Sequence, residues 1–511
     1  MRRGLIAWTA IVLRAQSPAD SSTVLHASTR LVQVNVIVDR KNAPVANLTR
    51  DDFILTDRGK PRTIDVFSIE SSATSGTSAA TLPPNTFSNR PSPGAAPPNV
   101  VIVLLDGRNT RFEDQANAKR QLVKFLRSVD PKDRIAIYTL TNTLRVLCDF
   151  TDNPEERQTI LAKFRGSTGT DVITAHPDLA NSGDAIIDEF VDQSNQIFAN
   201  RALVDSAGAT VAAFSAIASH VADLPGRKTL VWITGSLPFS LASAAKAFNR
   251  SNLAVYPVDA RGLVGMPGQL TASAPSPRRQ QHIAAFGPEG LQTMDQLAEL
   301  TGGRAFYNTN DLSGALRTAV EDSRVTYTLG FYLDSESLDG KFHELKVQVS
   351  RPGLNVRYRK EYLASKERPA SDEESKINLL HALDSPLESS TIPLSAKVTP
   401  GEGSLNILWS IDIHALHLEK KGGTANGAIN VFFVQTDGAG KSLDLTQEAY
   451  DVRLNYDVRL NKDEYETYLR TGMTYYRMLV LKKDAKTLRI LVADRSTAAV
   501  GSLIVPLSKV R

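Results

Sequence analysis

Residues 100–110 read VVIVLLDGRNT, an apolar run that ends at Asp106 and is followed by small and polar residues. Six consecutive apolar residues are typical of a strand that is buried on both faces. A helical pattern follows over residues 112–128. This order of strand, turn and helix predicts that Asp106 lies at the carboxyl end of a strand, which is where open α/β sheets bind their ligands.

The same alternation continues through residues 99–324. Short apolar strands are predicted at 100–105, 134–139, 144–150, 229–234, 254–259 and 304–307. Helical patterns separate them near 112–128, 154–164, 185–223, 240–250, 289–301 and 311–323. Such alternation predicts a Rossmann-like, doubly wound sheet, mostly parallel, with helices on both faces.

Two β segments flank this region. Residues 30–70 contain a strand with Val at four alternate positions, 32 to 38, and residues 325–365 contain three more strand patterns separated by turns. Neither segment is long enough to bury its own apolar face and edges. We therefore expect the two segments to form one composite β-sandwich into which the α/β domain is inserted.

Three further segments complete the organisation. Residues 71–98 are rich in Ser, Thr, Pro, Gly and Ala and predict a flexible linker, and the polar residues 366–376 predict another. Residues 377–511 predict a C-terminal β-sandwich-like domain. The hexamer YDVRLN occurs twice, at 450–455 and 456–461, and predicts one lengthened strand because an even repeat keeps each side chain on its face. The fold class is thus multidomain α/β plus β.

Composition narrows the class of protein. The chain has 511 residues, which suggests about three domains, and a net charge of +4. This charge is too small, and too scattered, to indicate nucleic-acid binding. The one cysteine, Cys148, excludes an internal disulfide and lies in a strand pattern, which favours a buried, unreactive thiol.

The N-terminus predicts export. Arg2 and Arg3 precede an apolar run at residues 5–13, which is too short to cross a membrane but suits a signal peptide over residues 1–16. A buried or frayed N-terminal segment is the alternative. Cleavage would remove three arginines and lower the net charge from +4 to +1. We expect a periplasmic, cell-envelope or extracellular protein without a transmembrane segment.

Taken together, these motifs resemble a known family. The strand that ends at Asp106 and the segment KTLVWITG at 228–235 look like a von Willebrand factor A domain. The resemblance is closest to the A-type-domain proteins of the Acidobacteria. The stretches that carry it are 31–38, 48–53, 57–61, 105–110, 224–228, 327–332, 339–343 and 351–353. It covers roughly residues 30–363.

The resemblance implies a metal-ion-dependent adhesion site, whose pattern is Asp-x-Ser-x-Ser, a Thr on a second loop and an Asp that ends a later strand. Asp106 matches the first Asp, and Thr110 matches the second hydroxyl. Thr170 is the candidate for the second-loop Thr. Arg108 stands where the first Ser belongs, and Thr234 stands where the late Asp belongs. The site is therefore degenerate.

Two interpretations of this site stay open. Asp106, Thr110 and Thr170 could still hold Mg²⁺ or Ca²⁺, which prefer oxygen ligands. The alternative is a metal-free site without any cofactor, with Arg108 paired to Asp106, because a guanidinium repels a cation. Asp106 alone could also simply cap the next helix.

We expect a binding or adhesion-type protein and not an enzyme. No catalytic residues are predicted. The ligand, a protein or surface molecule, would contact the crevice formed by loops 106–110, 234–239 and 259–262, and the predicted binding residues are Asp106, Arg108, Asn109, Thr110, Thr234, Ser236 and Asp259. A secreted hydrolase with a site between domains and a ligand-free cell-envelope scaffold are the alternatives. The oligomeric state is not indicated.

Overall fold

A computed structural model provides the coordinates of the chain. It describes residues 30–41, 43–71, 82–90, 99–130, 133–151, 204–222, 224, 226–237, 248, 252–263, 288–333, 337–364, 371–421, 424–455, 467–468 and 472–511. Several predictions fall outside these residues: the signal peptide, Thr170, the helix at 154–164 and the second copy of the hexamer. The helix predicted at 240–250 also falls outside them, apart from residue 248.

The middle of the chain forms a five-stranded sheet in the order β11-β10-β7-β8-β9. Four strands are parallel, and β9 runs antiparallel to β8. The predicted strand at 304–307 is reduced to a single bridge between Phe306 and Val258, so this prediction was too long. The strands are β7 Asn99–Asp106, β8 Ile135–Leu140, β9 Leu144–Thr151, β10 Arg227–Thr234 and β11 Leu253–Asp259.

The register of this sheet brings three strand ends together. Leu105 of β7 is aligned with Ile233 of β10, and Thr234 of β10 is aligned with Asp259 of β11. Because parallel strands end at the same edge, Asp106, Thr234 and Asp259 lie on neighbouring strands at one rim. The sequence pattern predicted this rim.

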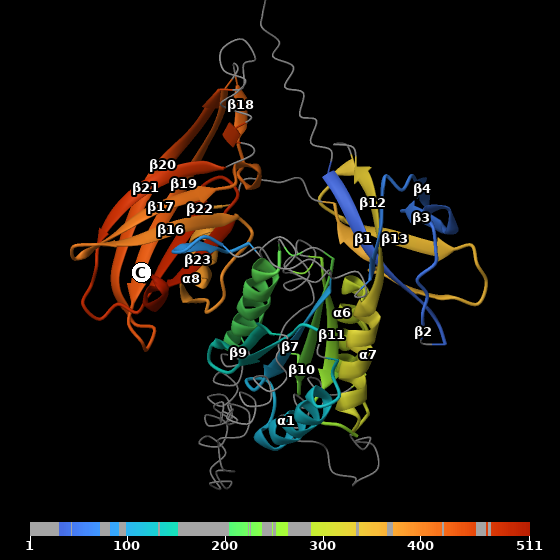
Figure 1. Ribbon diagram of the computed structural model, residues 1–511. Helices are drawn as coiled ribbons and strands as arrows, with labels where there is room; N and C mark the ends of the chain where they lie inside the picture. The colour runs from blue at the N-terminus through green and yellow to red at the C-terminus, as the bar shows by residue number, and fades with distance from the viewer. Residues whose placement is uncertain are drawn as a thin grey trace, which may run out of the picture.

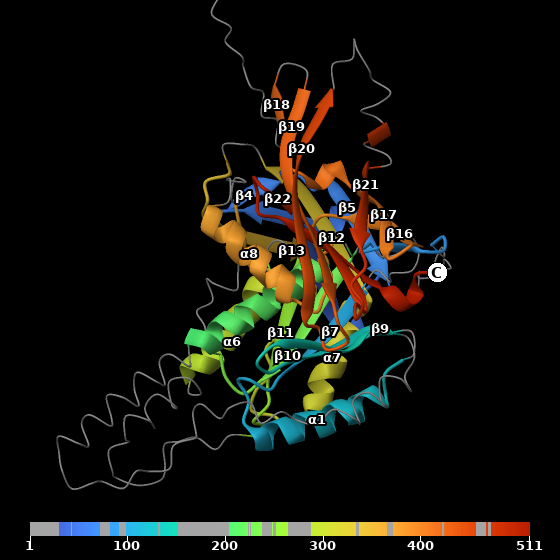
Figure 2. The same ribbon diagram turned by 90° about the vertical axis from the view of Figure 1, so that its left-hand side faces the viewer.

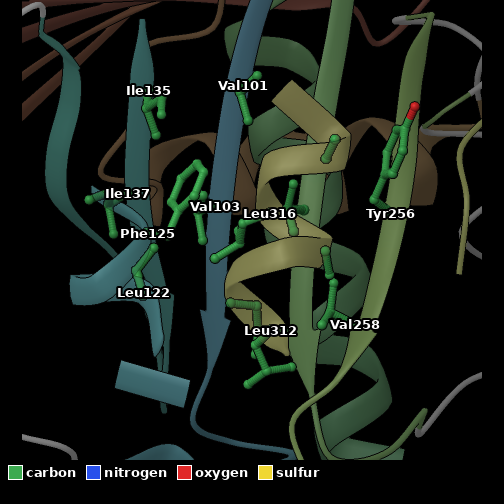
Figure 3. Close-up of a cluster of buried hydrophobic side chains, with 14 of the residues drawn as sticks. Val101, Val103, Leu122, Phe125, Ile135, Ile137, Tyr256, Val258, Leu312 and Leu316 are labelled. Atoms are coloured by element: carbon green, nitrogen blue, oxygen red, sulfur yellow. The ribbon is translucent and has the colours of Figure 1, made fainter. Parts of the chain in front are cut away.

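Alternating side chains of β7 enter two different cores. Val101, Val103 and Leu105 pack toward α1 (Phe112–Leu126) and α7 (Leu312–Arg324), as Figure 3 shows for the first two. Ile102 and Leu104 pack on the other face, against the helix at residues 204–220. Helix α6 (Pro288–Thr301) adds Leu297 to this second core. Burial of each such side chain stabilises the fold by about 1.5–3 kcal/mol.

The two flanking β segments pair with each other. Strand β1 lies between β12 and β14, and β12 also pairs with β5; in a second sheet, β13 pairs with β3 and β15. Helix α7 ends at Arg324 and β12 begins at the next residue, so the α/β domain leaves directly into this sandwich. The strands are β1 Arg30–Arg40, β2 Ala43–Pro44, β3 Phe53–Asp57, β4 Lys60–Arg62, β5 Val66–Ser71, β12 Val325–Leu333, β13 Phe342–Val349, β14 Asn355–Arg357 and β15 Glu361–Leu363.

The C-terminal region forms two sheets around one core. One sheet has the order β21-β17-β16-β6, and the other has β18-β19-β22-β23 with β20 on β19. The first copy of the hexamer lies at the end of β20. The strands are β16 Leu394–Gly401, β17 Ser404–Ile411, β18 Glu419–Lys421, β19 Thr424–Thr436, β20 Ser442–Asn455, β21 Met473–Val480, β22 Thr487–Asp494 and β23 Val500–Pro506.

Two linker predictions need correction. The predicted linker 71–98 contains β6 (Thr86–Ser88), which pairs with β16 of the C-terminal sheet. The side chain of Asn89 fixes it there, through bonds to the carbonyls of Ser389 and Ile392 and from the amide of Leu394. The region predicted as linker and β domain also contains helix α8 (Asp372–Asp384), which Ser371 and Glu374 cap reciprocally.

Figures 1 and 2 show how these parts are arranged. The α/β domain lies below the two β regions in both views, and α1 lies at its lower end. Since α1 follows directly on the carboxyl end of β7, the rim with Asp106 faces away from both β regions. In the described part of the chain, no helix is long and apolar enough to span a membrane.

Candidate functional site

Asp106 is the centre of the rim and is almost fully buried, with 2% of its surface exposed. Its Oδ2 accepts hydrogen bonds from Asn109 Nδ2 at 2.7 Å and from Trp232 Nε1 at 3.0 Å, and it lies 3.1 Å from the Thr234 hydroxyl. Its Oδ1 accepts the backbone N–H of Asn109 at 3.0 Å. All these donors are electrically neutral.

Burial and these donors have opposite effects on the carboxyl group. Burial raises the pKa of Asp106, the hydrogen bonds from Asn109, Trp232 and Thr234 lower it, and the net effect is a pKa above the usual value. The four donors thus reduce the cost of ionising a buried carboxyl group but do not cancel it.

Arg108 does not pair with Asp106, so that part of the metal-free hypothesis is wrong. Its Nε donates to the hydroxyl of Ser206, in the first turn of the helix at 204–220, at 3.1 Å. Arg108 is half-buried. Asp106 also does not cap α1, whose N-cap residue is Arg111.

The remaining rim residues tie the loops to one another. Thr110 Oγ1 accepts the N–H of Gly235 at 2.9 Å, and Ser236 Oγ donates to the carbonyl of Asn109 at 3.3 Å. The two loops approach so closely that a Cβ on Gly235 would lie 3.0 Å from that same carbonyl oxygen. The β7–α1 turn and the loop after β10 therefore form one hydrogen-bonded unit.

Asp259 acts on its own loop. Its carboxylate accepts hydrogen bonds from the backbone N–H, Nε and Nη2 of Arg261, at 3.0, 2.9 and 2.7 Å. Its side chain is 1% exposed. The sequence analysis placed it at the rim, and there it fixes the loop that follows β11.

The described rim residues leave few free lone pairs for a divalent cation. Mg²⁺ and Ca²⁺ need six or more oxygen ligands with free lone pairs. The oxygens of Asp106 already accept hydrogen bonds, and Thr110 Oγ1 accepts one from Gly235. Within the described ranges, no three His, Cys, Asp or Glu side chains form a group suited to a metal ion. Thr170 lies outside these ranges.

Three residues of the site were missed by the sequence analysis. Trp232 supplies a donor to Asp106, Thr210 accepts from Asn109 Nδ2 at 2.9 Å, and Gln115 donates to the carbonyls of Gly107 and Thr110, both at 2.8 Å. Trp232 was identifiable, because it lies two residues before Thr234 and strand alternation puts both on the same face. No local sequence pattern indicates that Thr210 and Gln115 belong to the site.

Beneath the turn lies a small cavity of about 20 Å³, room for about one water molecule. Asp106, Thr110, Gln115 and Thr139 are among the residues that line it. The hydroxyl of Thr139 is buried there and has no hydrogen-bond partner among the described residues. This cavity is too small for an organic ligand.

Buried His343 and half-buried His220 are the histidines that bear on the hydrolase alternative. His343 Nδ1 lies 3.0 Å from the Tyr362 hydroxyl, and its Nε2 lies 3.0 Å from Asp339 Oδ1. His220 Nδ1 lies 2.8 Å from the Glu388 carbonyl, and its Nε2 lies 3.6 Å from Asp149 Oδ2. Among the residues that the structure describes, no serine hydroxyl lies at hydrogen-bond distance from either ring, so these residues show no pair of the kind that acyl transfer needs.

Comparisons with known proteins assign no family. No family model and no curated protein matches the chain. Among solved structures, an aerotolerance-related membrane protein from Bacteroides fragilis is 14% identical, covers 43% of this chain and 98% of its own, and has a TM-score of 0.26. BatB, a conserved hypothetical protein from Bacteroides thetaiotaomicron, is 12% identical, covers 44% and 96%, and has a TM-score of 0.23.

A third structure is a von Willebrand factor type A protein from Catenulispora acidiphila. It is 10% identical, covers 79% of this chain and 77% of its own, and has a TM-score of 0.25. At these identities and TM-scores the likenesses assign no function to this chain. The resemblance to the Acidobacteria type stays a prediction from the sequence motifs.

Proposed function

We propose that this chain is an exported, non-enzymatic binding protein that holds a protein or surface ligand at the carboxyl-end rim of its α/β domain without a metal ion. The observation that carries this proposal is the hydrogen-bonded state of Asp106. Its oxygens are hydrogen-bonded by Asn109, Trp232 and Thr234, which are neutral donors inside the domain. The rim is thus rigid before any ligand arrives.

Pre-organised loops favour binding, because less conformational entropy is lost when a partner docks. The accessible side chains at this rim suit a protein partner. Phe112 is 47% exposed at the start of α1, and Leu263 is 66% exposed after β11. Arg108 and Asn109 are half-buried between the loops. Aromatic and arginine side chains are enriched in protein interfaces.

The metal-free part of the proposal is tested by calorimetric titration with Mg²⁺, Ca²⁺ and Mn²⁺. We expect no saturable heat from the wild-type protein. The Arg108→Ser variant restores the hydroxyl that the adhesion-site pattern requires. Its titration with the same ions is compared with that of the wild-type protein. Saturable binding of any of these ions to the wild-type protein at micromolar concentration would refute a metal-free rim.

The binding part is tested by photo-cross-linking. A benzophenone amino acid replaces Phe112 or Leu263 at the rim, and Tyr332, which is 47% exposed on the β-sandwich, is the matched control. The mature protein is incubated with envelope extract of its native host. We expect the same partner from both rim positions, none from Tyr332, and loss of the product in an Arg108→Ala background. Equal products from all three positions, or none, would overturn the proposal.

A further inference from the structure

The segment between α8 and β16 docks the C-terminal region onto the α/β domain. Leu387 enters the core that the helix at 204–220 shares with the central sheet. The backbone N–H of Ser390 donates to the carbonyl of Ser219 at 3.0 Å, and its hydroxyl donates to the carbonyl of His220 at 3.0 Å. This junction joins segments that are about 170 residues apart in the sequence.

His220 lies at the centre of the junction. Its side chain is 16% exposed, its Nδ1 lies 2.8 Å from the Glu388 carbonyl, and its Nε2 lies 3.6 Å from Asp149 Oδ2. Phe150 stacks on the ring, with centroids 6.1 Å apart and planes 5° from parallel. One ring therefore contacts the docking segment through Nδ1 and strand β9 through Nε2.

The chemistry of the two contacts favours one protonation state. A carbonyl and a carboxylate only accept hydrogen bonds, whereas a neutral imidazole carries a single N–H. The neutral ring can donate to Glu388 or to Asp149, but not to both. The imidazolium donates to the Glu388 carbonyl through Nδ1–H and at the same time turns a second N–H, with its charge, toward the Asp149 carboxylate at an ion-pair distance of 3.6 Å.

We propose that this junction is a proton-sensitive latch, in which protonation of His220 closes the C-terminal region onto the α/β domain and deprotonation loosens it. The junction is then tight at mildly acidic pH and opens as the pH rises. The latch controls how firmly the C-terminal β region is held relative to the domain that carries the rim.

The surrounding groups act in the same direction. Burial lowers the pKa of His220, but the contacts with Asp149 and the Glu388 carbonyl outweigh this effect and raise it above the usual value. Burial raises the pKa of Asp149, but the contacts with His220, Tyr138 and the backbone N–H of Phe150 together outweigh it and lower that pKa. The hydroxyl of Tyr138 also donates to Asp149, at 2.8 Å.

Other titratable groups face the junction from the C-terminal side. Burial raises the pKa of the Glu388 carboxyl group, against a hydrogen bond from the N–H of Ile504 and the charge of Arg489. A raised carboxyl pKa makes the folded junction less stable as the pH increases, which is the same sign as for His220. The contribution of His220 is complete below its ordinary pKa and is lost as the pH rises through its folded-state pKa.

The test measures hydrogen exchange of the full-length protein between pH 5.5 and 8.5, followed by mass spectrometry. Rates are corrected for the intrinsic pH dependence of exchange. In the wild-type protein, we expect protection of the peptide that contains the Ser390 amide to fall about tenfold or more over this range. That factor corresponds to one charge-assisted hydrogen bond. Amides of β7 serve as the internal check that the α/β domain stays folded.

Three variants decide the outcome. His220→Asn keeps a donor near Nδ1 without a charge and should show low protection that does not change with pH. Asp149→Asn should move the transition to lower pH. His414→Asn is the matched control, since His414 lies beside Asp412 but is 59% exposed and outside the junction; it should behave as wild type. A wild-type profile without a transition, or the same transition in His220→Asn, would overturn the latch.

Discussion

The hydrogen bond from Trp232 to Asp106 offers a direct test of how the rim is held. Trp232→Phe keeps an aromatic ring in the core but removes the Nε1–H that donates to Asp106 Oδ2 at 3.0 Å. Trp232 is fully buried and meets the edge of Phe214 at 5.0 Å, so water cannot easily replace the lost donor. The carboxylate would retain only the donors from Asn109 and Thr234.

The expected cost follows from these contacts. A hydrogen bond to a buried charge contributes about 1.5–3 kcal/mol, and the smaller ring removes roughly 1 kcal/mol of packing. Trp232→Phe should therefore destabilise the α/β domain by about 2.5–4 kcal/mol at pH 7.5. Burial raises the pKa of Asp106, and loss of a donor raises it further. The cost must therefore shrink in acid, where the carboxyl group is protonated.

Trp409→Phe is the matched control. Trp409 is equally buried in the C-terminal core and stacks on Tyr475 at 4.5 Å, but its Nε1–H has no acceptor in the described part of the chain. The same truncation there removes packing and no hydrogen bond. Its cost should be about 1 kcal/mol at both pH values.

Urea unfolding read by pulsed hydrogen exchange reports each region separately, through peptides of β7 and of β17. Measurements at pH 7.5 and pH 4.5 give the two costs for each variant. If Trp232→Phe costs no more than Trp409→Phe, or costs the same at both pH values, then the indole donor does not stabilise a charged Asp106 and the reasoning about the rim is wrong.

Two further substitutions test the fold around the site. Asn89→Ala removes three hydrogen bonds that fix β6, about 1.5–4.5 kcal/mol in sum, so the backbone amides of residues 86–89 should exchange hydrogen at least tenfold faster; an unchanged rate would contradict the fixed segment. Gly303→Ala would put a Cβ 1.9 Å from the carbonyl oxygen of Val255 and should cost about 1–3 kcal/mol of stability in thermal unfolding. Gly208 lies on a helix, and a Cβ added there would have no atom within 4 Å, so Gly208→Ala should be neutral or stabilising. A similar loss of stability in both variants would refute the clash at Gly303.

The central sheet was predictable because its signals are local. Six apolar residues before Asp106 indicate a strand buried on both faces, and β7 lies in the middle of the sheet with β10 and β8 beside it. The turn and the first hydrophobic residues of α1 follow at once in the sequence. The rim at Asp106, Thr234 and Asp259 follows from the shared direction of the strands.

The errors fall where the partner is distant in the sequence. Strand β6 lies in a segment whose composition is typical of a linker, and its partner β16 is about 300 residues away. Helix α8 was different, because Ser371 and Glu374 form a capping box that the sequence displays. This capping box indicates a linker shorter than the predicted 366–376.

The position of the rim was predicted, but the hydrogen bonds within it were not. The sequence places Arg108 two residues after Asp106, and the attraction between opposite charges favours an ion pair between them. The structure instead supplies neutral donors to Asp106 and a hydroxyl, Ser206, to Arg108. The direction of a long side chain depends on which acceptors the distant helix at 204–220 provides, and no local pattern gives this information.

The composite sandwich also sets the order in which the chain can fold during synthesis. The hydroxyl of Tyr327 donates to the carbonyl of Val45, 282 residues earlier. At about 5–20 residues per second, the ribosome needs roughly 15–55 seconds to make that interval. Throughout this time β1 has emerged while its neighbours β12 and β14 do not yet exist. β1 must therefore wait for these two partners, with most of its length open to other chains, until the whole α/β domain has been made.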